Sequence, residues 1–293
     1  MKSIALCKNL MVSGLMVVAT FLVFSCAAPG EKAKVTALDE SGTKTTEDIS
    51  ADREVSIDDI IMGGKLYDKW WVEISGVEEP RADHPLWSQQ ATNRRTGSAT
   101  WRCKECHGWD YFGKDGAYGK GSHMTGFSGV YQVRNMPVKD IESVLLGTTN
   151  VNHNYSSVLD YDSIYKLSVF LKYGLVDERE HVDYENKKPF RSDNEKGRML
   201  FNKECSKCHG EDGTRLDFGS DVLPQYIGTV AYKNPWEFIH KVRFGQPGAI
   251  MPALRIKLKL TEVEKRMPSG IETGHKMEDI MDILGYARTL PRK

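Results

Sequence analysis

Two stretches of the chain decide its fold: CKECH at residues 103–107 and CSKCH at residues 205–209. Both have the form Cys-x-x-Cys-His, and both are followed by glycine. In this spacing two thiols reach the two vinyl groups of one porphyrin, and the adjacent histidine falls beneath the iron. The sequence therefore predicts two covalently bound c-type haems, attached through Cys103, Cys106, Cys205 and Cys208, with His107 and His209 as the proximal iron ligands.

A Cys-x-x-Cys pair has two other interpretations, a thioredoxin-like redox motif and half of a zinc site. A zinc site needs further cysteines nearby. The chain has six cysteines, and the two outside the motifs, Cys7 and Cys26, belong to its first segment. The haem interpretation is therefore favoured, and no disulfide is expected in the mature protein.

The first segment has the pattern of an export signal. It begins with Lys2 and Lys8, continues through an apolar stretch at 10–24, and ends in Val-Phe-Ser-Cys at 23–26. This predicts a signal peptide over residues 1–25. The last four residues resemble a bacterial lipobox, so Cys26 is predicted to carry a lipid that anchors the protein to a membrane. Ordinary cleavage near 27–28 and an uncleaved anchor are the alternatives, and all three predict a periplasmic or otherwise extracytoplasmic location.

Charge and composition narrow the possibilities for the rest of the chain. Lysine and arginine number 40, as do aspartate and glutamate, so the formal net charge is zero and no nucleic acid partner is predicted. Residues 26–55 are polar and lack aromatic side chains, which is typical of a flexible tether. The remaining residues are numerous enough for two domains.

A repeated pattern leads into each Cys-x-x-Cys-His motif. SIDD at 56–59 is followed by a glycine and, four residues later, by Tyr67, whereas SDNE at 192–195 is followed in the same way by Phe201. The capping pattern predicts a helix that runs towards each motif. Together with Met251-Pro252, these features resemble class I cytochromes c. The resemblance implies an all-α fold of tandem class I cytochrome c-like domains, with loop insertions.

The repeat also sets the predicted domain boundaries. The first domain is expected over residues 56–178 and the second over residues 179–293, joined near 176–189. Glycines and prolines in residues 72–100 predict a long loop over the first haem. The glycine- and aromatic-rich segment 108–123 is interpreted either as a tight loop packed on the porphyrin edge or as a docking face for a redox partner or small substrate.

The distal iron ligands are predicted by aligning the segments that follow the motif in each half. Each half has a proline-started segment that ends in glycine, at 137–147 and 235–245. Six residues beyond the second glycine lies Met251, in a Met-Pro sequence that resembles the ligand loop of class I cytochromes. Six residues beyond the first glycine lies His153. The predicted pairs are therefore His107 with His153 and His209 with Met251, and Met124, Met136 and His123 remain alternatives for the first haem.

Two further helices complete the expected core. Apolar spacing predicts helices at 160–172 and 277–290, with an added excursion between 261 and 275. His240 and His275 are expected to face solvent or to pair locally, because both irons have candidate ligands elsewhere. The six tryptophans are expected in the haem pockets and core.

The resemblance implies one-electron transfer as the function, and no catalytic residue is predicted. Methionine ligation raises a haem potential relative to histidine ligation, so the first haem is expected to be the lower-potential centre. The expected partner is a redox protein, for example within a periplasmic oxidoreductase complex. The alternative is a dihaem enzyme, either a peroxidase or a sulfur-compound dehydrogenase. A thiosulfate dehydrogenase would use a cysteine as distal ligand, and none is spare.

Overall fold

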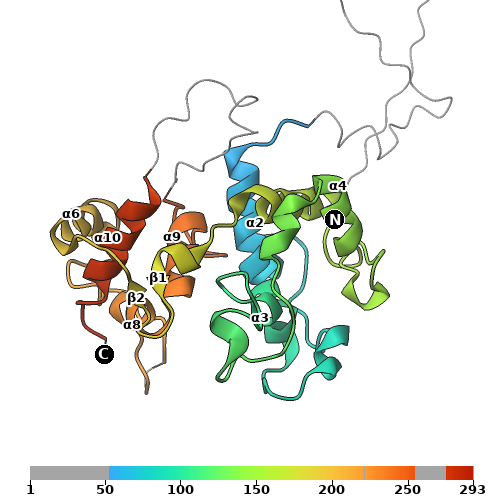
Figure 1. Cartoon of the computed structure of the whole chain (residues 1–293), viewed down its shortest axis with the longest axis horizontal. Coiled ribbons are helices and arrows are strands. Elements are labelled where there is room, and N and C mark those ends of the chain that lie inside the picture. Colours follow the sequence, from blue (N-terminus) through green and yellow to red (C-terminus); the bar gives the residue numbers. More distant parts are fainter. Residues whose placement is uncertain (1–52, 221, 255–274, 293) are drawn as a thin grey trace, which may run out of the picture. The chain divides into compact units, whose positions relative to one another are not determined.

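The computed structural model describes residues 53–220, 222–254 and 275–292 (Figure 1). The predicted signal peptide, nearly all of the tether and most of the excursion at 261–275 lie outside these residues. Both Cys-x-x-Cys-His motifs belong to one compact unit. In the described part, no helix is long and apolar enough to cross a membrane.

The described residues are mainly helical, with one short hairpin. The α-helices are α2 (Ile57–Lys69), α3 (Cys103–His107), α4 (Val138–Leu145), α5 (Tyr161–Val169), α6 (Asn194–Glu204), α7 (Ser206–His209), α8 (Ile227–Lys233), α9 (Pro235–Phe244) and α10 (Met277–Ala287). Strands β1 (Val182–Asp183) and β2 (Lys188–Pro189) pair antiparallel. Short 3-10 turns occur at Trp70–Val72, Pro85–Gln89, Gly97–Trp101, Ala117–Gly119, Tyr131–Asn135, Val151–His153 and Glu178–Glu180. The predicted helical fold class agrees with this content.

In the first half, α2 packs against α5. Ser56 caps α2, because its hydroxyl accepts a 3.0 Å hydrogen bond from the Asp59 N–H, as the SIDD pattern predicted. Gly63 allows the two helices to approach closely, since a Cβ there would lie 2.1 Å from the Lys166 carbonyl oxygen. Asp160 caps α5, which continues as a π-helical turn over Phe170–Gly174.

In the second half, α6 packs beside α10 (Figure 1). Gly197 takes the place that Gly63 takes in the first half, and a Cβ there would lie 2.0 Å from the Asp282 carbonyl oxygen. The helix begins one residue later than the SDNE pattern suggested, because Asp193 rather than Ser192 is the N-cap. The predicted helix at 277–290 ends at Ala287.

The two halves share a buried contact region, which we call the junction. Asp68 of α2, which is fully buried, forms ion pairs with both Arg102 and Lys241. His240 of α9 contacts the Tyr111 hydroxyl through Nδ1 at 3.0 Å and the Gly64 carbonyl oxygen through Nε2 at 2.9 Å. The expectation that His240 faces solvent or pairs locally is therefore wrong: the ring is fully buried, and both partners lie in the first half.

The aromatic side chains of segment 108–123 are packed in the interior. Trp109 and Tyr118 belong to the hydrophobic core of the second half, whereas Tyr111 belongs to that of the first. Tyr111 has a φ of 69°, in the region that bulky residues rarely adopt. The segment thus ties the two cores together, and its aromatic side chains are not displayed on a docking face.

Candidate haem centre

Both motifs adopt the same local geometry. Each forms a short helix that ends in a glycine with positive φ, 81° at Gly108 and 84° at Gly210. The N–H of Gly108 donates to the Lys104 carbonyl at 2.9 Å, and that of Gly210 donates to the Ser206 carbonyl at 2.8 Å. A glycine after each histidine is explained by this conformation, because it is unfavourable for residues with a Cβ.

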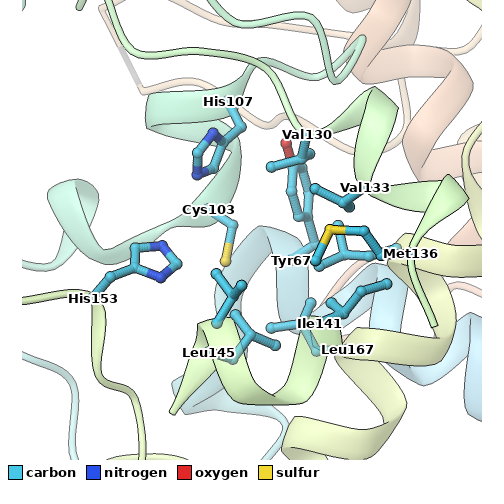
Figure 2. Close-up of a pocket in the computed structure, with 12 residues that line it drawn as sticks. Tyr67, Cys103, His107, Val130, Val133, Met136, Ile141, Leu145, His153 and Leu167 are labelled. Atoms are coloured by element: carbon cyan, nitrogen blue, oxygen red, sulfur yellow. The ribbon is translucent and has the colours of Figure 1, made fainter. Parts of the chain in front are cut away.

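The first motif opens onto a pocket with mainly apolar walls. Figure 2 shows His107, His153 and Cys103 at one end of the pocket and Met136 at the other. The remaining walls come mainly from α4, α5 and the turn before α4, and consist of Tyr67, Val130, Val133, Ile141, Val144, Leu145, Leu167 and Leu171. Apolar walls of this kind suit the faces of a largely buried planar cofactor.

His107 and His153 face each other across this space. Their ring centroids lie 6.3 Å apart. Two imidazoles that bind one metal from opposite sides, with bonds of about 2 Å, have centroids about 6 Å apart. The Nδ1 atom of His107 contacts the Ser128 carbonyl oxygen at 2.7 Å. That hydrogen bond places the proton on Nδ1 and leaves the Nε2 lone pair free for a metal.

The protonation of these histidines also suits a metal. Burial lowers the pKa of His107 to about 4, against the opposing effect of the Ser128 carbonyl, and it lowers the pKa of His153. Both rings are therefore neutral near pH 7, the form that binds iron. The buried Nδ1 of His153 lies near the Val144 carbonyl without a hydrogen bond of normal geometry. The residues present thus fit a haem iron between His107 and His153.

Three of the four motif thiols do not have the properties of redox-active cysteines. Burial raises the pKa of Cys103 and of Cys106 to about 12, and it does the same for Cys205. A reactive thiol instead has a lowered pKa, because its thiolate is the nucleophile. These cysteines suit covalent attachment to a porphyrin better than thioredoxin-like chemistry.

The alternative ligands for the first haem occupy different surroundings. Met124 is 38% exposed and does not line the pocket. His123 contacts Glu105 through Nδ1 at 2.9 Å and stacks on Tyr118. Met136 lines the pocket at the end away from the two histidines (Figure 2). Of the candidates named from sequence, His153 is the one that faces His107.

One residue of this region was not singled out from the sequence. His84, in the insertion before the motif, is 5% exposed, and its ring centroid lies 6.2 Å from that of His153. Trp101 and Tyr155 flank the His84 ring at 4.6 and 5.5 Å. The Leu86 N–H donates to Nδ1 of His84, so the neutral ring carries its proton on Nε2. Nothing in the sequence around His84 predicts that this histidine lies beside His153, because it is a single histidine in a proline-containing loop.

The structure shows less of the surroundings of the second motif. His209 is 7% exposed, and its buried Nδ1 has no hydrogen-bond partner among the described residues. The His209 ring lies 5.8 Å from that of Phe218, which is 49% exposed. Met251 is described, but no contact within the described ranges joins it to His209, and residues 255–274 lie outside them. The pairing of His209 with Met251 therefore stays a prediction.

Comparison with known families bears on this second region. The family model for cytochrome C oxidase, cbb3-type, subunit III matches residues 192–286, which include the second motif. The chain therefore carries a cytochrome c domain there, which binds c-type haem covalently and serves in electron transfer. Neither the curated proteins nor the solved structures gave a match. The match covers less than half of the chain and does not extend to the first motif.

Proposed function

We propose that the chain is a dihaem cytochrome c that transfers single electrons, with one haem in each half. The observation that carries the proposal is the pair of neutral imidazoles, His107 and His153, facing each other at 6.3 Å beside the Cys103 thiol. The matched family supports a haem in the second half, and the first half supplies an equivalent motif with its own apolar pocket.

In this proposal the first haem has two histidine ligands, His107 and His153, and the second has His209 and Met251. The bound iron supplies the one-electron chemistry. The chain's own residues hold the porphyrin, fix the imidazole of His107 through Ser128 and exclude water with apolar walls. Histidine–methionine ligation gives the higher potential, so electrons flow downhill from the first haem to the second.

The proposal includes export and a membrane anchor. The lipobox-like sequence at 23–26 supports processing to a lipid-bearing Cys26. A tether over residues 26–55 would then let the haem unit reach a redox protein near the membrane surface. Mass spectrometry of the mature N-terminus tests this part: a lipid on Cys26 supports it, and a free N-terminus near Ala28 refutes it.

Haem counting tests the main proposal. The intact mass of the purified holoprotein should exceed that of its polypeptide by two haems. Replacing both thiols of one motif, in Cys103→Ser/Cys106→Ser or in Cys205→Ser/Cys208→Ser, should remove one covalent haem and leave the other. A wild-type protein with a single haem, lost only in the second variant, would refute the role of the first motif.

The ligand assignment needs a separate test. Low-temperature EPR and near-infrared magnetic circular dichroism should show one bis-histidine and one histidine–methionine haem, both low-spin. His153→Met should raise the potential of the first haem alone and convert its spectrum to histidine–methionine ligation. The matched control is Met136→Leu in the same pocket, which should leave the ligation unchanged. A changed ligation in the control, with none in His153→Met, would assign Met136 instead.

The position of His84 favours a second candidate, a dihaem peroxidase. A third imidazole beside His153 places an acid–base group near the site that peroxide would occupy if His153 left the iron. In this case partial reduction of the protein should produce a high-spin first haem and peroxide turnover, and His84→Phe should abolish the turnover. A first haem that stays low-spin in both redox states refutes this candidate.

A further inference from the structure

A buried carboxyl group at the end of the first half has no use in the function proposed above. Glu178 is fully buried, and neither of its carboxyl oxygens has a hydrogen-bond partner among the described residues. A carboxylate in this position loses its hydration without compensation, which is unfavourable unless the group is neutral or bound to internal water. Burial therefore favours the protonated, neutral form of the Glu178 side chain.

The acidic groups around Glu178 also favour its protonated form, whereas the basic group Arg243 opposes it. The charged groups that act on Glu178 are Asp110 from the loop after the first motif, Arg243 from α9, and Asp177 from its own turn. The phenols of Tyr111 and Tyr184 are also electrostatically coupled to Glu178.

The charges of the interior groups in this cluster do not cancel when all of these groups are ionised. Asp110 is fully buried and accepts a 2.6 Å hydrogen bond from the Ala117 N–H. Arg243 is 2% exposed and donates from Nη2 to the Gly174 carbonyl, while its Nε and Nη1 have no partner in the described part. The Glu178 carboxyl group thus interacts with a second interior carboxyl group, that of Asp110, and with one guanidinium, that of Arg243. Burial raises the pKa of Glu178 and of Asp110, and like charges add to that of Glu178.

This cluster lies close to the pocket of the first motif. The ring of Tyr111 lies 5.6 Å from that of Tyr67, which lines the pocket. Asp110 comes three residues after His107 in the chain and is electrostatically coupled to Tyr67. Because the intervening groups are buried, charge placed at the pocket is weakly screened at Glu178.

We propose that Glu178 is a proton-binding site coupled to the first haem, so that one proton is taken up when this haem gains one electron. The electron comes from the redox partner and reduces the iron. The proton comes from solvent water and forms an O–H bond on the Glu178 carboxylate. When the haem is oxidised again, the electron and the proton both leave, so the net charge of the interior is the same in the two redox states. The inference rests on the proposed haem at His107.

The sign of the effect follows from the charge. An added electron favours the neutral form of a nearby carboxyl group, so Glu178 binds its proton more tightly in the reduced protein. Between the pH values at which the oxidised and reduced proteins lose this proton, the potential of the first haem falls as pH rises. Outside that window the potential does not depend on Glu178.

The test is a potentiometric titration of the holoprotein over a series of pH values that extends above the range in which an ordinary carboxyl group titrates. The first-haem potential should fall with pH in the wild type and should be flat in Glu178→Gln. The matched control is Glu180→Gln, which removes an exposed carboxyl group from the same turn. The control should keep the wild-type dependence.

Infrared difference spectroscopy supplies a second readout that needs no variant. Reduction should produce the carbonyl stretching band of a neutral carboxylic acid. This band should shift in protein purified from cells that were grown with isotope-labelled glutamate. A flat wild-type potential, or a pH dependence that persists in Glu178→Gln, overturns the inference. A band that shifts with labelled aspartate assigns the proton to Asp110 and also overturns it. Haem content and spin state, measured on the same samples, report separately whether the proposed function fails.

Discussion

The strongest prediction about stability concerns Asp68 in the junction. Its carboxylate is fully buried between Arg102 of the first half and Lys241 of the second. Burial alone would raise the pKa of Asp68, but the two cations outweigh it and hold this pKa well below its usual range. Asp68→Asn keeps the size of the side chain and removes the charge, which leaves two largely buried cations without their counter-ion.

The expected cost is large because the group is interior. Removing one partner of a buried ion pair costs roughly 3–5 kcal/mol of unfolding free energy. The matched control is Asp162→Asn, since Asp162 also pairs with two cations, Arg53 and Lys166, but is 49% exposed. Exposed pairs contribute about 0–1 kcal/mol, so the control should lose no more than that.

The assay is urea unfolding of the holoprotein, followed by far-ultraviolet circular dichroism and analysed by linear extrapolation. Combining Asp68→Asn with Lys241→Met should cost less than the sum of the single variants, because each removes the same interaction. Added salt should weaken the contribution of Asp162 more than that of Asp68. A cost for Asp68→Asn within about 1 kcal/mol of the control would refute the prediction that the buried ion pairs of Asp68 contribute strongly to stability.

Three further predictions concern single contacts. Gly63→Ala should destabilise the protein by about 1–3 kcal/mol or more in urea unfolding, because the added methyl group would lie 2.1 Å from the Lys166 carbonyl oxygen. Tyr67→Phe should cost about 1–3 kcal/mol in the same assay, because the Gly108 carbonyl loses the hydroxyl that donates to it at 2.7 Å. Burial lowers the pKa of His240 to about 3, whereas the same group in the unfolded chain titrates near pH 6.5. Acid titration should therefore show the unfolding free energy falling between about pH 6.5 and pH 3, by up to about 5 kcal/mol. The variant His240→Gln should lack this pH-dependent loss of stability.

Local signals in the sequence predict the helices well. The SIDD pattern predicts the cap at Ser56, and the Asn-Pro sequence predicts the start of α9 at Pro235. The same reasoning is wrong at Pro137, which caps α4 rather than opening its first turn. A proline tolerates both positions, because neither needs its missing N–H. Spacing alone cannot decide between them.

The junction could not be predicted, because its signals depend on contacts between distant segments. Nothing near His240 in the sequence distinguishes a surface histidine from one that is buried and hydrogen-bonded to Tyr111 and Gly64. The composition of the glycine- and aromatic-rich loop after the first motif is compatible with packing and also with docking. Its burial is decided by the second half, which covers Trp109 and Tyr118.

The two proline-started segments make different contacts in the two halves. Leu145 and Arg243 each lie eight residues after their proline. Leu145 walls the pocket of the first motif, whereas Arg243 is buried and donates to the Gly174 carbonyl at the end of the first half. Glu142 and His240 each lie five residues after their proline, and His240 again contacts the first half. Helix α9 therefore contributes polar contacts across the junction, whereas α4 contributes an apolar side chain to the pocket of the first motif.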